Sequence, residues 1–113
     1  MLNRYCLAVV AAALMAALPL TTSAAVQDKV DEDALCASLS RVAETIMANR
    51  QAGQTMRKAM EIANTEPQAA GVVGAIVKMA YALPRYSTPS ARQDTITEFG
   101  NEVMRMCYNR TGK

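Results

Sequence analysis

The sequence contains no histidine and no tryptophan, and only one phenylalanine among its 113 residues. Without histidine, the chain lacks the commonest general base, the commonest metal ligand and the usual activator of a serine or cysteine nucleophile. It also contains no Gly-x-Ser-x-Gly motif, no Ser-x-x-Lys motif and no phosphate-binding glycine loop. These absences argue against an enzyme, and they predict neither a cofactor nor a metal.

Carboxylates are the remaining candidates for acid–base chemistry. Glu98 and Glu102 lie four residues apart, a spacing that a solvated helix face explains more simply than a catalytic pair. The acidic triplet 31–33 is a poor metal site because consecutive helical residues point in different directions, and it suits the start of a helix instead. An enzyme that uses only carboxylates is therefore the least favoured class of function.

The N-terminal segment has the pattern of a secretory signal peptide. A single basic residue precedes the apolar run Cys6–Leu20, and small residues follow it. The run is shorter than the about 20 apolar residues that a membrane-spanning helix needs. We expect residues 1–25 to be removed before Val26, with a cut after Ala24 as the alternative, leaving one domain over 26–113. The expected location is periplasmic or secreted, with no membrane anchor after cleavage.

Charge is nearly balanced in the expected mature chain. The whole sequence has 12 basic and 10 acidic side chains, and loss of Arg4 with the signal peptide would leave a net charge of +1. Such a balance provides no basic field for nucleic acid or for an anionic membrane surface. We therefore expect no nucleic-acid partner.

Two cysteines, Cys36 and Cys107, remain near the ends of that mature chain. An even pair in an exported protein predicts a disulfide, since the compartment is oxidising. The loop it would close is long, so the bridge should stabilise a small domain by roughly 4 kcal/mol. The pairing predicts that the first and last helices are neighbours.

Helical periodicity extends along the whole mature chain. Apolar residues at 35, 39, 42 and 46 predict a first helix that starts at the acidic triplet, ends near Ala52 and is capped by Gly53. A short helix follows around 56–63, and Thr65 is a candidate N-cap for the next.

The third predicted helix, over 69–83, is apolar on nearly all sides, which is typical of a central helix. Pro84 ends it, and Thr88 with Pro89 begins the last one. No alternation typical of strands occurs. The predicted fold is all-α, a small helical bundle of three long helices and one short helix closed by one disulfide.

Methionine is abundant, with eight in the sequence. Thioethers fill irregular gaps in a core, and this is the favoured interpretation; the alternative is an adaptable apolar binding groove. A copper site is less favoured because the methionines are not closely clustered and no histidine accompanies them.

Two segments, Ile46–Ala63 and Ala80–Tyr108, together with Cys36, resemble a group of small exported helical proteins found in proteobacterial genomes and their phages. The shared pattern is Cys…RQxG…AYxxPRYxT…CY. Gly100 departs from it, because the group usually has a larger side chain there, and a glycine predicts a less straight final helix. The resemblance implies a compartment and an architecture but no activity. The matching positions are Arg50, Gln51, Gly53, Met56, Tyr81, Pro84, Arg85, Tyr86, Phe99, Asn101, Cys107 and Tyr108.

The segment YALPRYST, residues 81–88, combines two tyrosines, a proline and an arginine between two predicted helices. The tyrosines could cover the end of the bundle, with Arg85 stacked on one ring, or the corner could contact a partner, since tyrosine and arginine dominate interface hot spots. Both interpretations stay open. The candidate binding residues are Arg50, Gln51, Tyr81, Arg85 and Tyr86.

The sequence thus predicts a non-enzymatic binding module of the periplasm or the exterior, with phage or prophage origin as one version. Its expected partner is a protein or an envelope component that no sequence feature names. The alternative is a small disulfide-linked stress chaperone that exposes apolar, methionine-rich surface when acid neutralises its carboxylates.

Overall fold

The computed structural model describes the backbone of residues 24–110 and the side chains of residues 31–110. Over this range the fold is all-α, with no strand, as predicted; the four helices are α1 (Ala24–Gln51), α2 (Met56–Ala63), α3 (Ala70–Tyr81) and α4 (Pro89–Arg110). None of these helices has the length and apolar character needed to cross a membrane. Cys6 and most of the predicted signal peptide lie outside the described residues.

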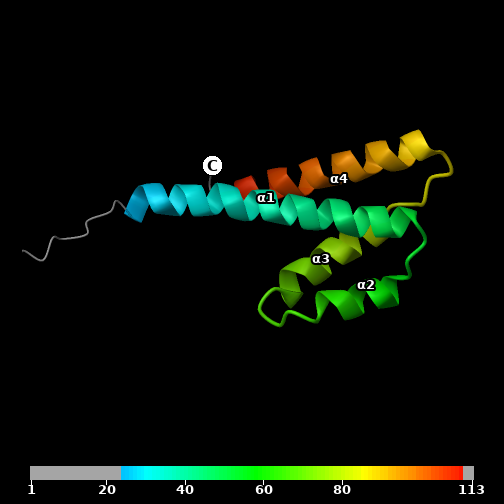
Figure 1. The fold of residues 1–113 in the computed structure, drawn as a ribbon, viewed down its shortest axis with the longest axis horizontal. Coiled ribbons are helices and arrows are strands. Elements are labelled where there is room, and N and C mark those ends of the chain that lie inside the picture. The colour runs from blue at the N-terminus through cyan, green and yellow to red at the C-terminus, as the bar shows by residue number, and fades with distance from the viewer. Residues whose placement is uncertain (1–23, 111–113) are drawn as a thin grey trace, which may run out of the picture.

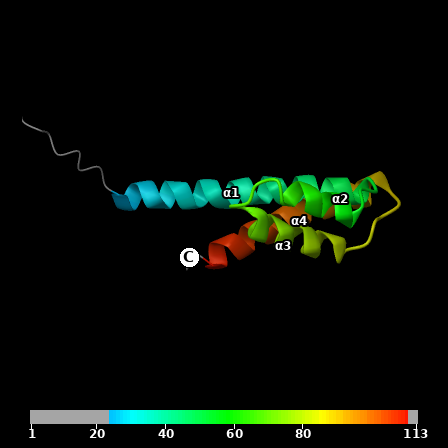
Figure 2. The same ribbon diagram turned by 90° about the horizontal axis from the view of Figure 1, so that it is seen from below.

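The central helix is α1. It packs against both α4 and α3, while α2 packs on α3. In Figure 1, α4 lies above α1 and α3 below it, and the view turned by 90° in Figure 2 shows both on the same side of α1. The prediction that the segment 69–83 is the central helix is wrong, because part of the apolar surface of α3 is not covered by any described helix.

A disulfide between Cys36 and Cys107 joins α1 to α4, with the two Cα atoms 5.5 Å apart. This confirms the predicted pairing. The two helices also approach closely at Gly100, whose carbonyl accepts a hydrogen bond of 2.9 Å from the Ser40 hydroxyl. A Cβ at this glycine would meet the Glu44 side chain at 2.6 Å, so its absence allows the contact. The last helix is assigned without a break through Gly100.

The hydrophobic core lies where α1, α3 and α4 meet, extended by two alanines of α2. On α1 the buried stripe passes through Cys36, Ala43 and Met47. Leu35, which the periodicity placed in the core, is 55% exposed instead. The buried stripe is rotated from the predicted one because α1 contacts helices along two lines rather than one. The core comprises Ala43, Ile46, Met47, Ala59, Ala63, Ile76, Val77, Ala80, Phe99 and Val103.

The N-terminus of α1 differs from its prediction. The helix begins at Ala24, so the acidic triplet 31–33 lies inside it rather than in the first turn. The residues between the start of the helix and the acidic triplet are tolerated in a helix. The local sequence therefore does not require the helix to start at the carboxylates.

At its C-terminus, α1 ends at Gln51 in a Schellman motif, as the glycine predicted. The Gln54 N–H donates to the Asn49 carbonyl (2.9 Å) and the Gly53 N–H to the Arg50 carbonyl (3.0 Å). Gly53 has φ = 100°, a left-handed conformation that side chains disfavour.

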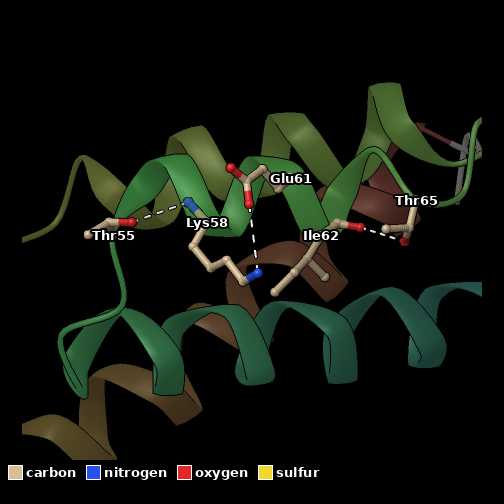
Figure 3. Close-up of polar contacts among 5 residues, drawn as sticks. All are labelled: Thr55, Lys58, Glu61, Ile62 and Thr65. Carbon is tan, nitrogen blue, oxygen red and sulfur yellow. Dashed lines mark hydrogen bonds and ion pairs between the residues drawn. The ribbon is translucent and has the colours of Figure 1, made fainter.

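A threonine hydroxyl forms a hydrogen bond at each end of the short helix α2, whose N-cap is Thr55 and whose C-cap is Asn64 (Figure 3). The Thr55 hydroxyl accepts a hydrogen bond from the Lys58 N–H (3.2 Å), and the Thr65 hydroxyl donates to the Ile62 carbonyl (2.7 Å). Thr65 therefore bonds the last turn of α2 and is not the predicted N-cap of the next helix, which begins at Ala70 without a side-chain cap. An exposed ion pair, Lys58–Glu61, spans one turn at 3.7 Å.

Two glycine substitutions should change stability in opposite directions. Gly53→Ala should lower the free energy of unfolding by at least about 1 kcal/mol, because alanine is disfavoured at positive φ; its Cβ would also lie 3.4 Å from the Arg85 guanidinium. Gly71→Ala should raise the free energy of unfolding by up to about 1 kcal/mol, because it adds a better helix former where no atom lies within 4 Å of the new Cβ. Urea titrations of the two variants measure both effects, and equal shifts would contradict the assigned backbone conformation.

Candidate functional site

All five predicted binding residues gather where the end of α1 meets the connection between α3 and α4. Gln51 is at the centre and is only 2% exposed. Its Nε2 donates to the Pro84 carbonyl (2.9 Å), and its Oε1 accepts from the Tyr86 N–H (2.8 Å). One side-chain amide thus satisfies a donor and an acceptor of the connection.

Arg50 and Tyr81 hold the other side of this connection. The Arg50 Nε and Nη2 both donate to the Leu83 carbonyl, at 3.2 and 3.1 Å. The same guanidinium lies over the Tyr81 ring, 5.0 Å from its centroid, within the range of a cation–π contact. The Tyr81 hydroxyl donates to the Gln54 carbonyl at 2.6 Å, which ties the end of α3 to the turn after α1.

Arg85 and Tyr86 complete the arrangement, but not as predicted. The Arg85 Nε donates to the Gln51 carbonyl (3.2 Å), and its guanidinium lies beside Gly53, so the arginine that stacks on a tyrosine is Arg50 rather than Arg85. Tyr86 takes part through its backbone, and its carbonyl accepts a hydrogen bond from the Arg92 Nε at 2.6 Å. We call Arg50, Gln51, Tyr81, Arg85 and Tyr86 the corner latch.

The corner latch has a structural role that explains most of its chemistry. Four of its five side chains make intramolecular hydrogen bonds; the ring of Tyr86 is instead turned partly to solvent and is 37% exposed. A partner that bound Arg50 or Gln51 would first have to displace these bonds. Sequence reasoning identified the residues but missed their acceptors, which are backbone carbonyls and leave no residue signature.

Two tyrosines are held in environments that favour the neutral phenol. Burial raises the pKa of Tyr81 above its ordinary value of 10.0, and the nearby Arg50 lowers it by less. Burial also raises the pKa of Tyr108, as do Asp33, which accepts a hydrogen bond from the hydroxyl, and Glu32. This second tyrosine links α4 to α1 near the disulfide.

The free energy of unfolding should therefore fall at alkaline pH. A folded-state pKa above the unfolded value means that the contribution of each tyrosine is complete below about pH 10 and is lost as the pH rises through the folded-state pKa. Denaturant titrations from pH 7 to 11, with tyrosinate absorbance at each step, test this. The variant Tyr81→Phe should show a weaker alkaline loss of stability, whereas an unchanged pH dependence in that variant would contradict the assignment to Tyr81.

A second feature, whose position the sequence did not indicate, is a hollow of about 520 Å³ bounded by α1, α3 and α4. Its floor includes the buried side chains of Ile76 and Val103. Three large apolar side chains at its rim are exposed to water: Leu35 (55%), Val72 (46%) and Met106 (41%). We call this hollow the apolar groove. It is lined by Leu35, Leu39, Gly71, Val72, Ala75, Ile76, Met79, Val103, Met106, Cys107 and Arg110.

The apolar groove is a consequence of the sequence of α3. This helix is apolar nearly all round, yet α1 and α2 cover only part of its circumference. The remaining surface, with Val72, Ala75 and Met79, faces the gap between α3 and α4. The all-round apolar pattern was the available signal, but it was interpreted as typical of a central helix.

Two smaller hollows have more polar side chains in their linings. One, of about 280 Å³ beside α2, includes Arg41, Thr45 and Asn49 in its lining. The other, of about 310 Å³ beside the corner latch, combines Leu83, Tyr86 and Phe99 with the carboxylates of Asp94, Glu98 and Glu102. Glu102 also forms an ion pair with Arg105.

Among the described residues, no group of three or more histidine, cysteine, aspartate or glutamate side chains could hold a metal ion. Of these three hollows, the apolar groove has the most apolar residues in its lining and the largest apolar surface, which makes it the candidate binding site. No protein-family model, curated protein or solved structure matches the chain.

Proposed function

We propose that the protein is a non-enzymatic, exported binding module that takes an apolar ligand into the apolar groove, while the corner latch fixes the helices that form it. The observation that carries this proposal is the exposed rim, Leu35, Val72 and Met106, around a floor of buried side chains. Contiguous apolar surface of this kind is costly in water and marks binding sites.

The walls of the groove are held in place before any ligand arrives. Cys107 belongs to the lining and is bonded to Cys36 of the central helix. At the opposite end, the Gln51 side chain fixes the connection between the end of α3 and the start of α4. Fixing the walls in advance reduces the conformational entropy that binding would otherwise cost.

The composition of the lining suits a ligand of variable shape. Met79 and Met106 contribute flexible thioethers to it, which adapt to irregular surfaces. This supports the interpretation of the methionines that the sequence left as the alternative, although Met47 is fully buried in the core. The absence of histidine from the sequence agrees with binding rather than catalysis.

Binding of a neutral, environment-sensitive dye such as Nile red tests this proposal. Wild type should bind the dye, and Val72→Asp, which places a charge on the exposed rim, should weaken binding at least tenfold. The matched control is Ile62→Asp, since Ile62 is equally exposed (49%) but lies on α2. Equal affinities of the two variants, or a loss confined to Ile62→Asp, would contradict the assignment.

The corner supplies a second control. Tyr86→Ala removes the one ring of the corner latch with a substantially exposed surface and leaves its backbone bonds available. Dye affinity should be unchanged in this variant. A loss as large as that of Val72→Asp would move the binding site to the corner.

A further inference from the structure

We propose that the ligand of the apolar groove is a single acyl chain ending in a carboxylate, with Arg110 as the partner of the carboxylate. This inference rests on the proposed function and adds the chemical class of the ligand. Three observations support it: the order of polar and apolar groups along the lining, the size of the groove, and the exposed Arg110 side chain, which has no partner among the described residues 31–110.

The lining has one charged residue among eleven. Ten of the lining residues are apolar, glycine or the disulfide-bonded Cys107, and none of these carries a hydrogen-bonding side chain. The exception, Arg110, belongs to the last turn of α4 and so lies at an end of the groove. A ligand that matches this lining is apolar along its length and anionic at one end.

The size of the groove favours a chain over a helix. An apolar cavity of about 150 Å³ accommodates the six carbons of benzene, so a groove of about 520 Å³ accommodates on the order of 20 carbons. A ten-residue helix occupies on the order of 1,200 Å³, as a cylinder about 10 Å wide and 15 Å long. A helix could therefore rest only its apolar edge on the rim, and its polar flanks would meet a single hydrogen-bonding side chain in the lining, that of Arg110.

Arg110 is free to bind such a ligand. It is exposed, and it makes no hydrogen bond or ion pair with another residue of the described range 31–110. Its planar guanidinium matches the two oxygens of a carboxylate. The end of α4 on its own repels an anion with about half an elementary charge. The full charge of Arg110, the one cation in the lining, opposes this repulsion and that of Asp33 and Glu32, which lie near Tyr108 in the same turn of α4.

The test compares two ligands with the same chain, dodecanoate and its neutral glycerol ester, each displacing the neutral dye at pH 7.5 below the concentration at which it forms micelles. Wild type should bind dodecanoate at least tenfold more tightly than the ester. Arg110→Gln should abolish or reverse this preference, because it should weaken the binding of dodecanoate much more than that of the ester. Arg105→Gln, on the same helix but outside the groove, should keep the wild-type preference.

Each other outcome overturns a defined part of the account. Equal affinities for the two ligands in wild type would overturn the role of Arg110 and leave the binding groove in place. Suppose that the dye binds wild type and binds Val72→Asp more weakly, but that neither ligand displaces it. This result would overturn the proposal of an acyl-chain ligand, and sedimentation would then show whether a second copy of the protein occupies the rim. Failure of the dye itself to bind would overturn the proposed function. Thermal midpoints of the variants confirm that they are folded.

Discussion

The double variant Cys36→Ala/Cys107→Ala is expected to unfold at a thermal midpoint about 20 °C below that of wild type. The disulfide joins residues separated by 71 positions, and closing such a loop stabilises the folded state by roughly 4 kcal/mol in the chain-entropy model. Each kcal/mol is equivalent to about 4–8 °C in a domain of this size. Alanine is preferred to serine because Cys36 is fully buried, and a hydroxyl there would add a second penalty.

Reduction supplies the control for this effect. Wild type in excess reductant should approach the midpoint of the double variant, whereas reductant should leave the double variant unchanged. A double variant that unfolds within about 3 °C of wild type, less than the shift expected for 1 kcal/mol, would contradict the stabilising role of the bridge.

Gln51→Leu is expected to lower the free energy of unfolding by about 1–3 kcal/mol, since it removes two partly buried hydrogen bonds that each contribute about 0.5–1.5 kcal/mol. Leucine has a similar volume, but it neither donates to the Pro84 carbonyl nor accepts from the Tyr86 N–H. Urea titration measures the change. Amide hydrogen exchange should also accelerate at Tyr86, because its N–H loses its acceptor.

The matched control is Gln93→Leu, which makes the same change at an exposed position on α4. It should alter the free energy of unfolding by no more than about 0.5 kcal/mol. If both glutamine variants show the same small change, the hydrogen bonds of the corner latch do not stabilise the fold, and the corner would regain its interpretation as a partner surface.

Much of the fold could be predicted from the sequence because its signals are local. Gly53 indicated the end of α1 through the conformation that a Schellman motif requires. Thr88 and Pro89 indicated the start of α4, where the Thr88 hydroxyl accepts from the Ala91 N–H at 3.2 Å. The cysteine pair indicated that the first and last helices are neighbours.

The candidate site was only partly predictable because it depends on packing between helices. The corner residues were identified, but whether Arg50 and Gln51 face solvent or the chain itself depends on where the connection after α3 lies, and no local pattern fixes that. Periodicity placed Leu35 in the core, yet it is 55% exposed and lies at the rim of the apolar groove. An apolar stripe shows that a residue favours burial, not that a neighbouring helix is present to bury it.

The most direct test of the central claim, that the apolar groove rather than the corner binds the ligand, is a methyl NMR titration of protein labelled at its methionines. Met79 and Met106 line the groove, whereas Met56 and Met104 do not. On addition of dodecanoate, the signals of Met79 and Met106 should shift and saturate together with the affinity measured by dye displacement, while those of Met56 and Met104 stay in place. Saturable shifts confined to Met56 or Met104, or no saturable shift at Met79 and Met106, would contradict the account.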